Sequence, residues 1–257
     1  MSRRRIALFA CALSTATAPS WAEAPPHDGR WRGLAGASLA LSGGNTESSA
    51  LLVNVNVSRR VDGGKTSLQS FINQAQSKVN GDRKTTANKW GASGQQDLDL
   101  TPDWFTFVKL GIDADRVIEL KRRGNVAVGL GRHVIRSERH TFDVIGGVSH
   151  TRSVYREEQT INAKTGTRFS NTGVLIGEES SHQLNDTVSA KQRLEYNQGL
   201  SGDKVDVLRF NGSINVAISK VTSLSVGLIS SYNSKVPPGV KKVDTSLFTG
   251  LNVKLGE

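Results

Sequence analysis

Apolar and polar residues alternate in about twelve short segments of this chain, and this alternation restricts its fold more than any other feature. In the clearest segment, Leu208, Ile214 and Val216 fall on one face, while Arg209 and Asn215 fall on the other. A repeat of two residues is that of a β-strand, whose successive side chains point to opposite faces. We therefore expect an all-β chain with strands at residues 31–42, 49–60, 65–79, 88–100, 105–117, 125–136, 140–154, 169–183, 187–199, 205–219, 222–234 and 244–255.

The connections between these segments predict that the strands close into a membrane barrel. Every second connection is short and rich in turn-forming residues, as at 61–64 and 101–103, whereas those between them are longer, as at 157–167 and 235–243. Short turns at one rim and long loops at the other are typical of bacterial outer-membrane barrels. A soluble sandwich has no reason to sort its loops in this way. We therefore predict an antiparallel, up-and-down transmembrane β-barrel over residues 31–257.

Two features predict how this barrel would sit in a membrane. The apolar side of each strand is expected to face lipid, as in the stripe of Leu51, Val53, Val55 and Val57. Aromatic residues gather near the strand ends, where they would form the interfacial girdles. We expect a periplasmic girdle of Trp31, Trp104 and Phe142, and an outer girdle of Trp90, Tyr155, Phe169, Tyr196 and Tyr232.

The first residues have the pattern of a secretory signal peptide. Three arginines are followed by an apolar stretch at 6–13 and by small residues up to Ala22. Cleavage after Ala22 or after Ala24 fits this pattern, and the former is favoured because Pro25 would adjoin the second site. We expect a signal peptide at 1–22, a short segment at 23–30, and export to the outer membrane of a Gram-negative bacterium.

The charge balance is basic, with a formal net charge of +10, but it does not indicate nucleic-acid binding. The basic residues are spread over many segments, and an exported chain rarely meets nucleic acid. The lack of any long apolar run excludes helical membrane spans. We expect the partners to be outer membrane lipids, lipopolysaccharide and the barrel insertion machinery, and no nucleic acid.

Two motifs carry a resemblance to a known family. The first strand begins with Trp31 and Gly33 and leads into Ser42-Gly43-Gly44-Asn45-Thr46, and a central hairpin contains Gly129-Leu-Gly131-Arg132 with Gly146-Gly147. These motifs resemble the salt-induced outer membrane protein family, a YdiY-like group of unknown function, over essentially the whole chain after the leader. The resemblance implies an outer-membrane β-barrel linked to salt or envelope stress, with no established reaction or ligand.

Charged residues in the strands are expected to face the lumen. Acidic residues on one wall would face basic residues on the wall roughly opposite, which would set up a field across a pore. Alternatively, the charges pair across a narrow lumen and fill it, as side chains do in small barrels. We favour the narrow or plugged lumen over a passive porin-like channel for small polar or ionic solutes. The candidate lumen charges are Asp97, Asp99, Asp113, Asp115, Lys109, Lys191, Arg193 and Arg209.

Enzymatic and metal chemistry are weaker alternatives. A lipid hydrolase of the outer membrane would need a serine activated by a histidine. His133 could meet Ser149 on the next wall, whereas His150 adjoins Ser149 on a strand and points to the opposite face. The aspartate pairs could hold Ca²⁺, but pairing with Lys109 is favoured. We therefore expect no enzyme, no catalytic residue, no cofactor and no metal site.

Basic residues in the longer connections are expected to lie on the outer rim. A ring of cations there would meet the phosphate groups of lipopolysaccharide. Solvated polar loops are the equally weighted alternative. The candidate lipopolysaccharide-facing residues are Arg83, Lys84, Lys121, Arg122, Arg123, Lys241 and Lys242.

Overall fold

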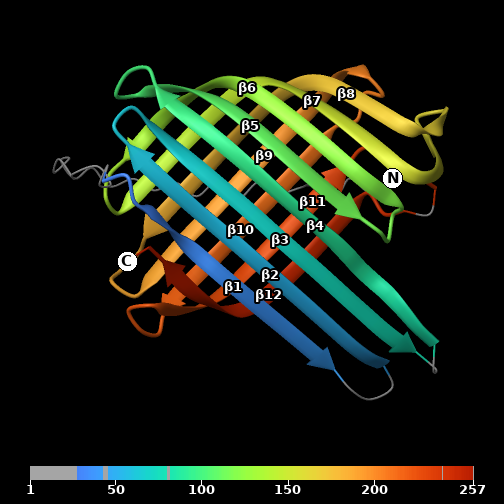
Figure 1. Cartoon of the computed structure of the whole chain (residues 1–257), viewed down its shortest axis with the longest axis horizontal. Helices are drawn as coiled ribbons and strands as arrows, with labels where there is room; N and C mark the ends of the chain where they lie inside the picture. Colours follow the sequence, from blue (N-terminus) through green and yellow to red (C-terminus); the bar gives the residue numbers. More distant parts are fainter. Residues whose placement is uncertain (1–27, 43–45, 80–81, 239, 257) are drawn as a thin grey trace, which may run out of the picture.

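The computed structural model of this chain is a closed barrel of twelve antiparallel strands (Figure 1). It describes residues 28–42, 46–79, 82–238 and 240–256. The predicted fold class, a closed up-and-down antiparallel β-barrel of about twelve strands, is confirmed. The predicted signal peptide and most of the Ser42–Thr46 motif lie outside the described residues. The part described contains no helix that is long and apolar enough to cross a membrane.

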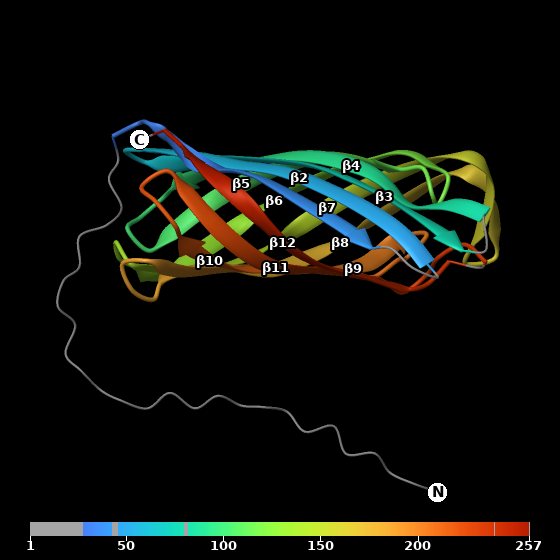
Figure 2. The same ribbon diagram turned by 90° about the horizontal axis from the view of Figure 1, so that it is seen from below.

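Each strand pairs with the next one along the chain, and the last pairs with the first. The strands are β1 (Trp31–Ser42), β2 (Thr46–Val61), β3 (Gly64–Val79), β4 (Asp82–Asp99), β5 (Trp104–Asp115), β6 (Leu120–Arg136), β7 (His140–Ile161), β8 (Lys164–Gln183), β9 (Val188–Gly202), β10 (Val207–Ala217), β11 (Thr222–Asn233) and β12 (Val243–Leu255). The closing ladder joins residues 33–37 of β1 to residues 251–255 of β12. Figure 2 shows these two strands meeting at one end of the barrel.

The outer surface of the barrel is largely apolar because the alternation places the apolar side of the strands there. Side chains on this face include Leu39, Leu110, Ile176 and Leu247, and Leu247 is 77% exposed. The predicted lipid-facing stripes therefore lie on the outer face, where lipid acyl chains would contact them. Trp90, also on this face, is 45% exposed and fits the predicted outer girdle.

The connections at the outer end differ from the prediction. The strands continue past the expected boundaries, so that β7 ends at Ile161 and β8 begins at Lys164. Only Asn162 and Ala163 join them, with φ values of 53° and 62° that suit a tight hairpin turn. Only the connection at 234–242 is long. The prediction failed because the apolar face fades beyond the lipid, while the backbone ladder continues.

Two aromatic residues assigned to the outer girdle point into the mouth of the barrel instead. Tyr155 and Phe169 are 9% and 5% exposed, and their rings meet edge to face with 5.7 Å between centroids. They pack with Leu120 and Ile161 in a small apolar cluster. An alternating pattern cannot separate a ring on the lipid face from one that covers an extended hairpin.

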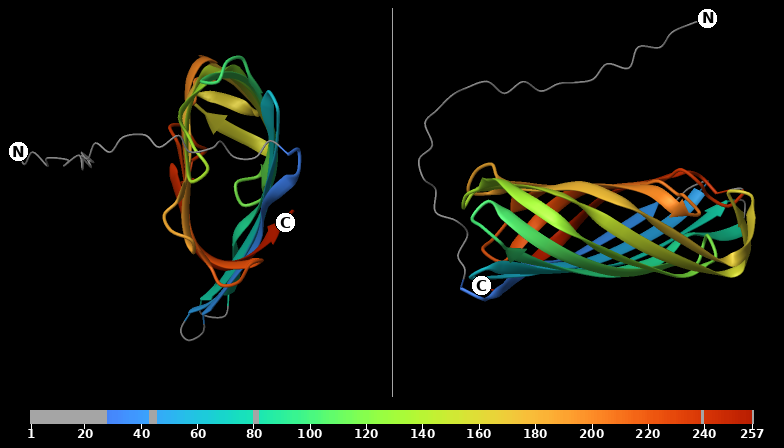
Figure 3. Two further views of the ribbon diagram at one scale, coloured as in Figure 1. Left: turned by 90° about the vertical axis from the view of Figure 1, so that its left-hand side faces the viewer. Right: turned by 90° about the horizontal axis from the view of Figure 1, so that it is seen from above.

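The barrel is flattened, with an elongated cross-section when viewed along its axis (Figure 3). Glycines on the inner face of the central hairpin allow large side chains to lie against the wall. A Cβ atom on Gly131 would lie 2.1 Å from Cζ of Phe105, and one on Gly129 would lie 2.2 Å from the Gly146 carbonyl oxygen. Flattening and close packing together bring opposite walls within reach of one another.

Candidate functional site in the lumen

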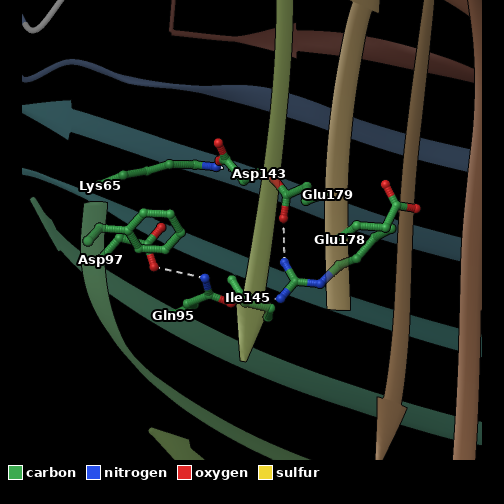
Figure 4. Close-up of a pocket in the computed structure, with 9 residues that line it drawn as sticks. Lys65, Gln95, Asp97, Asp143, Ile145, Glu178 and Glu179 are labelled. Atoms are coloured by element: carbon green, nitrogen blue, oxygen red, sulfur yellow. Dashed lines mark hydrogen bonds and ion pairs between the residues drawn. The ribbon is translucent and has the colours of Figure 1, made fainter. Parts of the chain in front are cut away.

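Charged side chains reach across the lumen from facing walls. Lys65 of β3 donates a hydrogen bond from Nζ to Oε1 of Glu179 on β8, at 3.2 Å. Arg193 of β9 donates from Nη1 to the other oxygen of Glu179. Its Nε donates to Glu195 on the same strand, at 2.8 Å. In Figure 4 the side chains of Lys65 and Glu179 point toward one another.

The opposite wall completes this arrangement through β4 and β5. Arg193 also donates from Nη2 to Oε1 of Gln95, at 2.7 Å. Lys109 of β5 donates to Glu195. We call Lys65, Gln95, Lys109, Glu179, Arg193 and Glu195 the cross-lumen network. Its charges alternate in sign along the chain of contacts, so that each carboxylate lies between two cations.

Asp97 lies beside this network and is nearly buried, with 6% of its surface exposed. It accepts a hydrogen bond from Nε2 of Gln95, at 2.8 Å. It also stands directly opposite Lys65 in the ladder between β3 and β4. Asp97 thus lies between Gln95 and Lys65 of the network, on the wall formed by β3 and β4.

An apolar layer fills the lumen next to the network. Phe105 and Phe107 are each 1% exposed and pack with Ala127 and Leu175. Ile145 packs against the same group. The cavity left between this layer and the network has a volume of about 10 Å³. Such a space holds about one water molecule.

A second charged group lies nearer the short-turn end. Nη2 of Arg136 donates to Asp99 at 3.0 Å. Nδ1 of His133 lies 2.7 Å from Asp143, and its ring stacks on Phe105 with 4.6 Å between centroids. The imidazole therefore joins the apolar layer to the charged groups.

The outer half of the lumen carries two further ion pairs. Lys89 of β4 donates to Asp244 of β12, which spans the mouth between strands that are not neighbours. Nη2 of Arg123 donates to Asp113 on the adjacent strand, at 2.8 Å. Arg123 thus points into the lumen, so its assignment to the lipopolysaccharide-facing rim was wrong. The strand β6 begins at Leu120 and not at residue 125, so Arg123 is part of its regular alternation and shares the inner face with Asn125 and Ala127.

The strand register places all eight predicted lumen charges on the inner face: Asp97, Asp99, Asp113, Asp115, Lys109, Lys191, Arg193 and Arg209. Their partners differ from those expected. Lys109 pairs with Glu195 and not with the aspartates. Lys191 and Arg209 form no ion pair with the described part of the chain. The acidic and basic groups do not form two opposed walls, because most cations have a carboxylate partner beside them or across the lumen.

Sequence reasoning missed four members of the cross-lumen network, namely Gln95 and the charged residues Lys65, Glu179 and Glu195. Their signal was present, because each falls on the polar side of a strand alternation. Glu179 was obscured by its neighbour Glu178, which points away from the lumen and accepts a hydrogen bond from Gln192. Lys65 follows a tight turn directly, where the face of a strand is hard to assign.

The residues considered for catalysis are not brought together. His133 is held by Asp143 and Phe105, whereas the Ser149 hydroxyl donates to Asn197 at 2.6 Å. His150 lies on the outer face beside Thr172. Within the described ranges, no group of three or more His, Cys, Asp or Glu residues could hold a metal ion. Asp99 and Asp113, considered for Ca²⁺, each pair with an arginine.

The remaining rim candidates lie at the outer end of the barrel. Arg83 and Lys84 lie at the start of β4 and are exposed. Lys121 and Arg122 lie at the start of β6, also exposed. Lys241 and Lys242 are exposed in the connection between β11 and β12. Within the described residues, none of these six cations forms an ion pair with a carboxylate.

Comparisons with known proteins give a family and a set of similar folds. A family model described as "Protein of unknown function, DUF481" matches residues 35–255. No curated protein matches the sequence.

Solved structures with a similar strand arrangement come from several bacteria. An outer membrane channel from Pseudomonas putida has 11% identity, 93% coverage of this chain, 100% coverage of that chain and a TM-score of 0.47. The translocator domain of the autotransporter NalP from Neisseria meningitidis has 11% identity, coverages of 89% and 88%, and a TM-score of 0.46. An anion-selective porin from Comamonas acidovorans has 11% identity, coverages of 88% and 98%, and a TM-score of 0.39.

Proposed function

The chain belongs to the DUF481 family of proteins of unknown function, and we propose that it is an outer-membrane β-barrel whose lumen is closed by its own side chains. The cross-lumen network carries this proposal. Arg193 contacts side chains from β4, β8 and β9, so that a single guanidinium joins both walls. Solute passage at this level would require those bonds to break.

The energetics favour a closed arrangement. Buried charges are tolerated when they are paired and hydrogen-bonded, and each charge of the network has such a partner. Breaking one pair would leave a charge in a space that holds about one water molecule, which is costly. The apolar layer behind the network offers an ion no polar contacts. Together these features support a barrel that does not conduct at rest.

The apolar outer face supports a location in the outer membrane of a Gram-negative bacterium, because a barrel of this kind presents such a face to lipid. Separation of membranes from expressing cells tests this location. The protein is expected in the outer-membrane fraction and to migrate faster on gels before heating than after. A soluble periplasmic protein would contradict the proposal.

Single-channel recording in planar bilayers tests the closed lumen. The unaltered barrel is expected to be silent. The double variant Arg193→Ala with Glu195→Ala removes the bridging side chains and is expected to give ohmic current steps. The matched control, Gln192→Ala with Leu194→Ala, alters the lipid face of the same strand and should stay silent. Folding of each variant is checked by its gel mobility before heating.

A passive channel for small polar or ionic solutes is the second candidate function. It is favoured by polar residues on β2 and β10, beside the network strands β3 and β9, where Asn56 and Asn211 are exposed. Steady ohmic steps from the unaltered barrel would support this candidate and refute closure. Silence of the double variant would show that the network does not hold the lumen shut.

We propose that the barrel has no enzymatic activity. The support is that His133 and Ser149 have separate partners and do not contact one another. A fluorogenic phospholipid assay on the refolded barrel tests this statement. Hydrolysis that is lost in a Ser149→Ala variant would contradict it.

A link to salt or envelope stress rests on the sequence resemblance alone. Measurement of protein abundance at low and raised salt, with growth of a deletion strain under both conditions, tests this link. Unchanged abundance and growth would remove it.

A further inference from the structure

A groove on the outer face of the barrel gathers four basic side chains near the outer ends of β6, β7 and β8, which lie side by side in Figure 1. It is lined by Lys121, Arg122, Arg152 and Arg168, together with three further residues, Ile112, Gly124 and Val154. Its volume is about 440 Å³. Pockets of this size accept groups as large as a phosphorylated sugar.

The strand register explains why the arginines converge. Arg122 and Arg168 stand on either side of Val154, each directly paired with it. Arg152 stands opposite Gly124, where a Cβ atom would have no neighbour within 4 Å. The missing side chain therefore leaves space in front of Arg152. Three neighbouring strands thus supply one guanidinium each around an open floor.

These four cations lack acidic partners. In the part of the chain that the structure describes, none of them forms an ion pair or a side-chain hydrogen bond. Most lumen cations differ in this respect, since Lys65, Lys109, Arg123 and Arg193 all have carboxylate partners. Clustered like charges repel one another unless an anion neutralises them.

The position of the groove indicates which anion that is. Its apolar members, Ile112 and Val154, lie on the lipid face. Leu110 and Val126, paired on the same face, continue the apolar band toward the short-turn end. An occupant would therefore place a negative group among the arginines and an apolar chain along the adjoining wall. Arginine suits phosphate because its planar fork can donate two parallel hydrogen bonds.

We propose that this groove binds a phosphate group of the phosphorylated glycolipid of the outer leaflet, lipopolysaccharide. Arg122, Arg152 and Arg168 contact the phosphate, Lys121 adds charge from above, and Ile112 with Val154 contacts the first part of an acyl chain. The inference rests on the proposed outer-membrane location but not on closure of the lumen. It narrows the broad rim of cations to one site and adds two arginines to it.

Binding of lipopolysaccharide to the refolded barrel in detergent tests the proposal. The double variant Arg152→Gln with Arg168→Gln is expected to bind at least about tenfold more weakly than the unaltered barrel, because two charge-assisted contacts are lost. The matched control, Arg83→Gln with Lys84→Gln, removes two cations elsewhere on the outer rim. It should bind within about twofold of the unaltered barrel. A third variant, Arg152→Lys with Arg168→Lys, keeps the charge, and its affinity is expected to lie between those of the glutamine variant and the unaltered barrel.

Several results would overturn the proposal. Equal affinity of the glutamine variant and the unaltered barrel would do so, as would an equal loss in the control. Lipopolysaccharide stripped of its phosphates should bind weakly, and undiminished binding would refute the phosphate contact. Inorganic phosphate that binds as tightly as the lipid would indicate a free anion instead. If the glutamine variant does not fold, the lysine variant supplies the same comparison. Channel recordings on these variants separate failure of this site from failure of the closed lumen, since the groove lies outside the lumen.

Discussion

The alternating charges of the cross-lumen network predict that loss of a carboxylate costs more stability than loss of the central cation. Arg193→Gln removes one cation but leaves two complete pairs, Lys65 with Glu179 and Lys109 with Glu195. Glu195→Gln instead leaves Lys109 without a carboxylate partner, while Lys65 and Arg193 share Glu179.

The magnitudes follow from burial and from the bonds lost. The Glu195 side chain is 7% exposed and accepts hydrogen bonds from both Lys109 and Arg193. Removal of one partner from a buried ion pair costs about 3–5 kcal/mol, because the remaining charge is left uncompensated. The Arg193 variant loses hydrogen bonds to Glu179, Glu195 and Gln95, but it strands no charge because each carboxylate keeps its lysine. A net loss of about 1.5–3 kcal/mol, the value of one hydrogen bond to a charged group, is therefore expected. The two variants should therefore differ by about 2 kcal/mol in the free energy of unfolding.

Urea unfolding of the barrel in lipid vesicles, followed by tryptophan fluorescence, provides the measurement. Trp90 and Trp104 lie on the lipid face, so their emission reports the loss of the inserted barrel. Lys191→Gln is the control, because this lysine faces the lumen on the same strand without an ion pair in the described chain. It should change the free energy by less than about 0.5 kcal/mol. An Arg193 variant as destabilised as the Glu195 variant would refute the alternating arrangement.

Two further predictions concern the backbone, and the same unfolding assay measures both. Gly131→Ala should destabilise the barrel by about 1–3 kcal/mol, because its Cβ atom would overlap the Phe105 ring, whereas Gly146→Ala has open space and should be nearly neutral. Equal effects of the two would show that Phe105 does not rest on that wall. Ala163→Gly should stabilise the barrel by about 0.5–1 kcal/mol, since alanine is held at a φ of 62° that glycine adopts freely. A destabilised Ala163→Gly variant would argue against this turn.

Much of the wall could be predicted from the sequence because a strand has a fixed period of two. That period alone assigned Arg193 and Lys109 to the lumen, and the short turns gave the correct start of β7 at His140. The outer strand ends could not be predicted in the same way. Above the lipid both faces of a strand meet water, so the apolar contrast that marks a strand disappears.

Partners across the lumen were beyond the sequence for another reason. Lys109 meets Glu195, four strands away, only because of the stagger of the strands and the flattening of the barrel. Arg123 meets Asp113 because β6 begins at Leu120, before the predicted strand start at residue 125, which places Arg123 within the inward-facing alternation of the strand. The groove around Arg152 also depends on such neighbours, since its members come from three strands. Local patterns give the face of a side chain, and the closed sheet determines what it meets.

The ladder between β1 and β12 has a consequence for how the barrel is made. It joins only residues 33–37 to 251–255, and beyond Ala37 and Leu251 the two strands are not paired with each other in the described chain. All other pairings link consecutive strands and close short loops, whereas this one brings together the two ends of the sheet. Assembly should therefore proceed as a growing open ribbon, with this short seam forming in the final step. The unpaired outer edges of β1 and β12 then mark the line along which a nascent barrel parts most easily to admit lipid or an assembly factor.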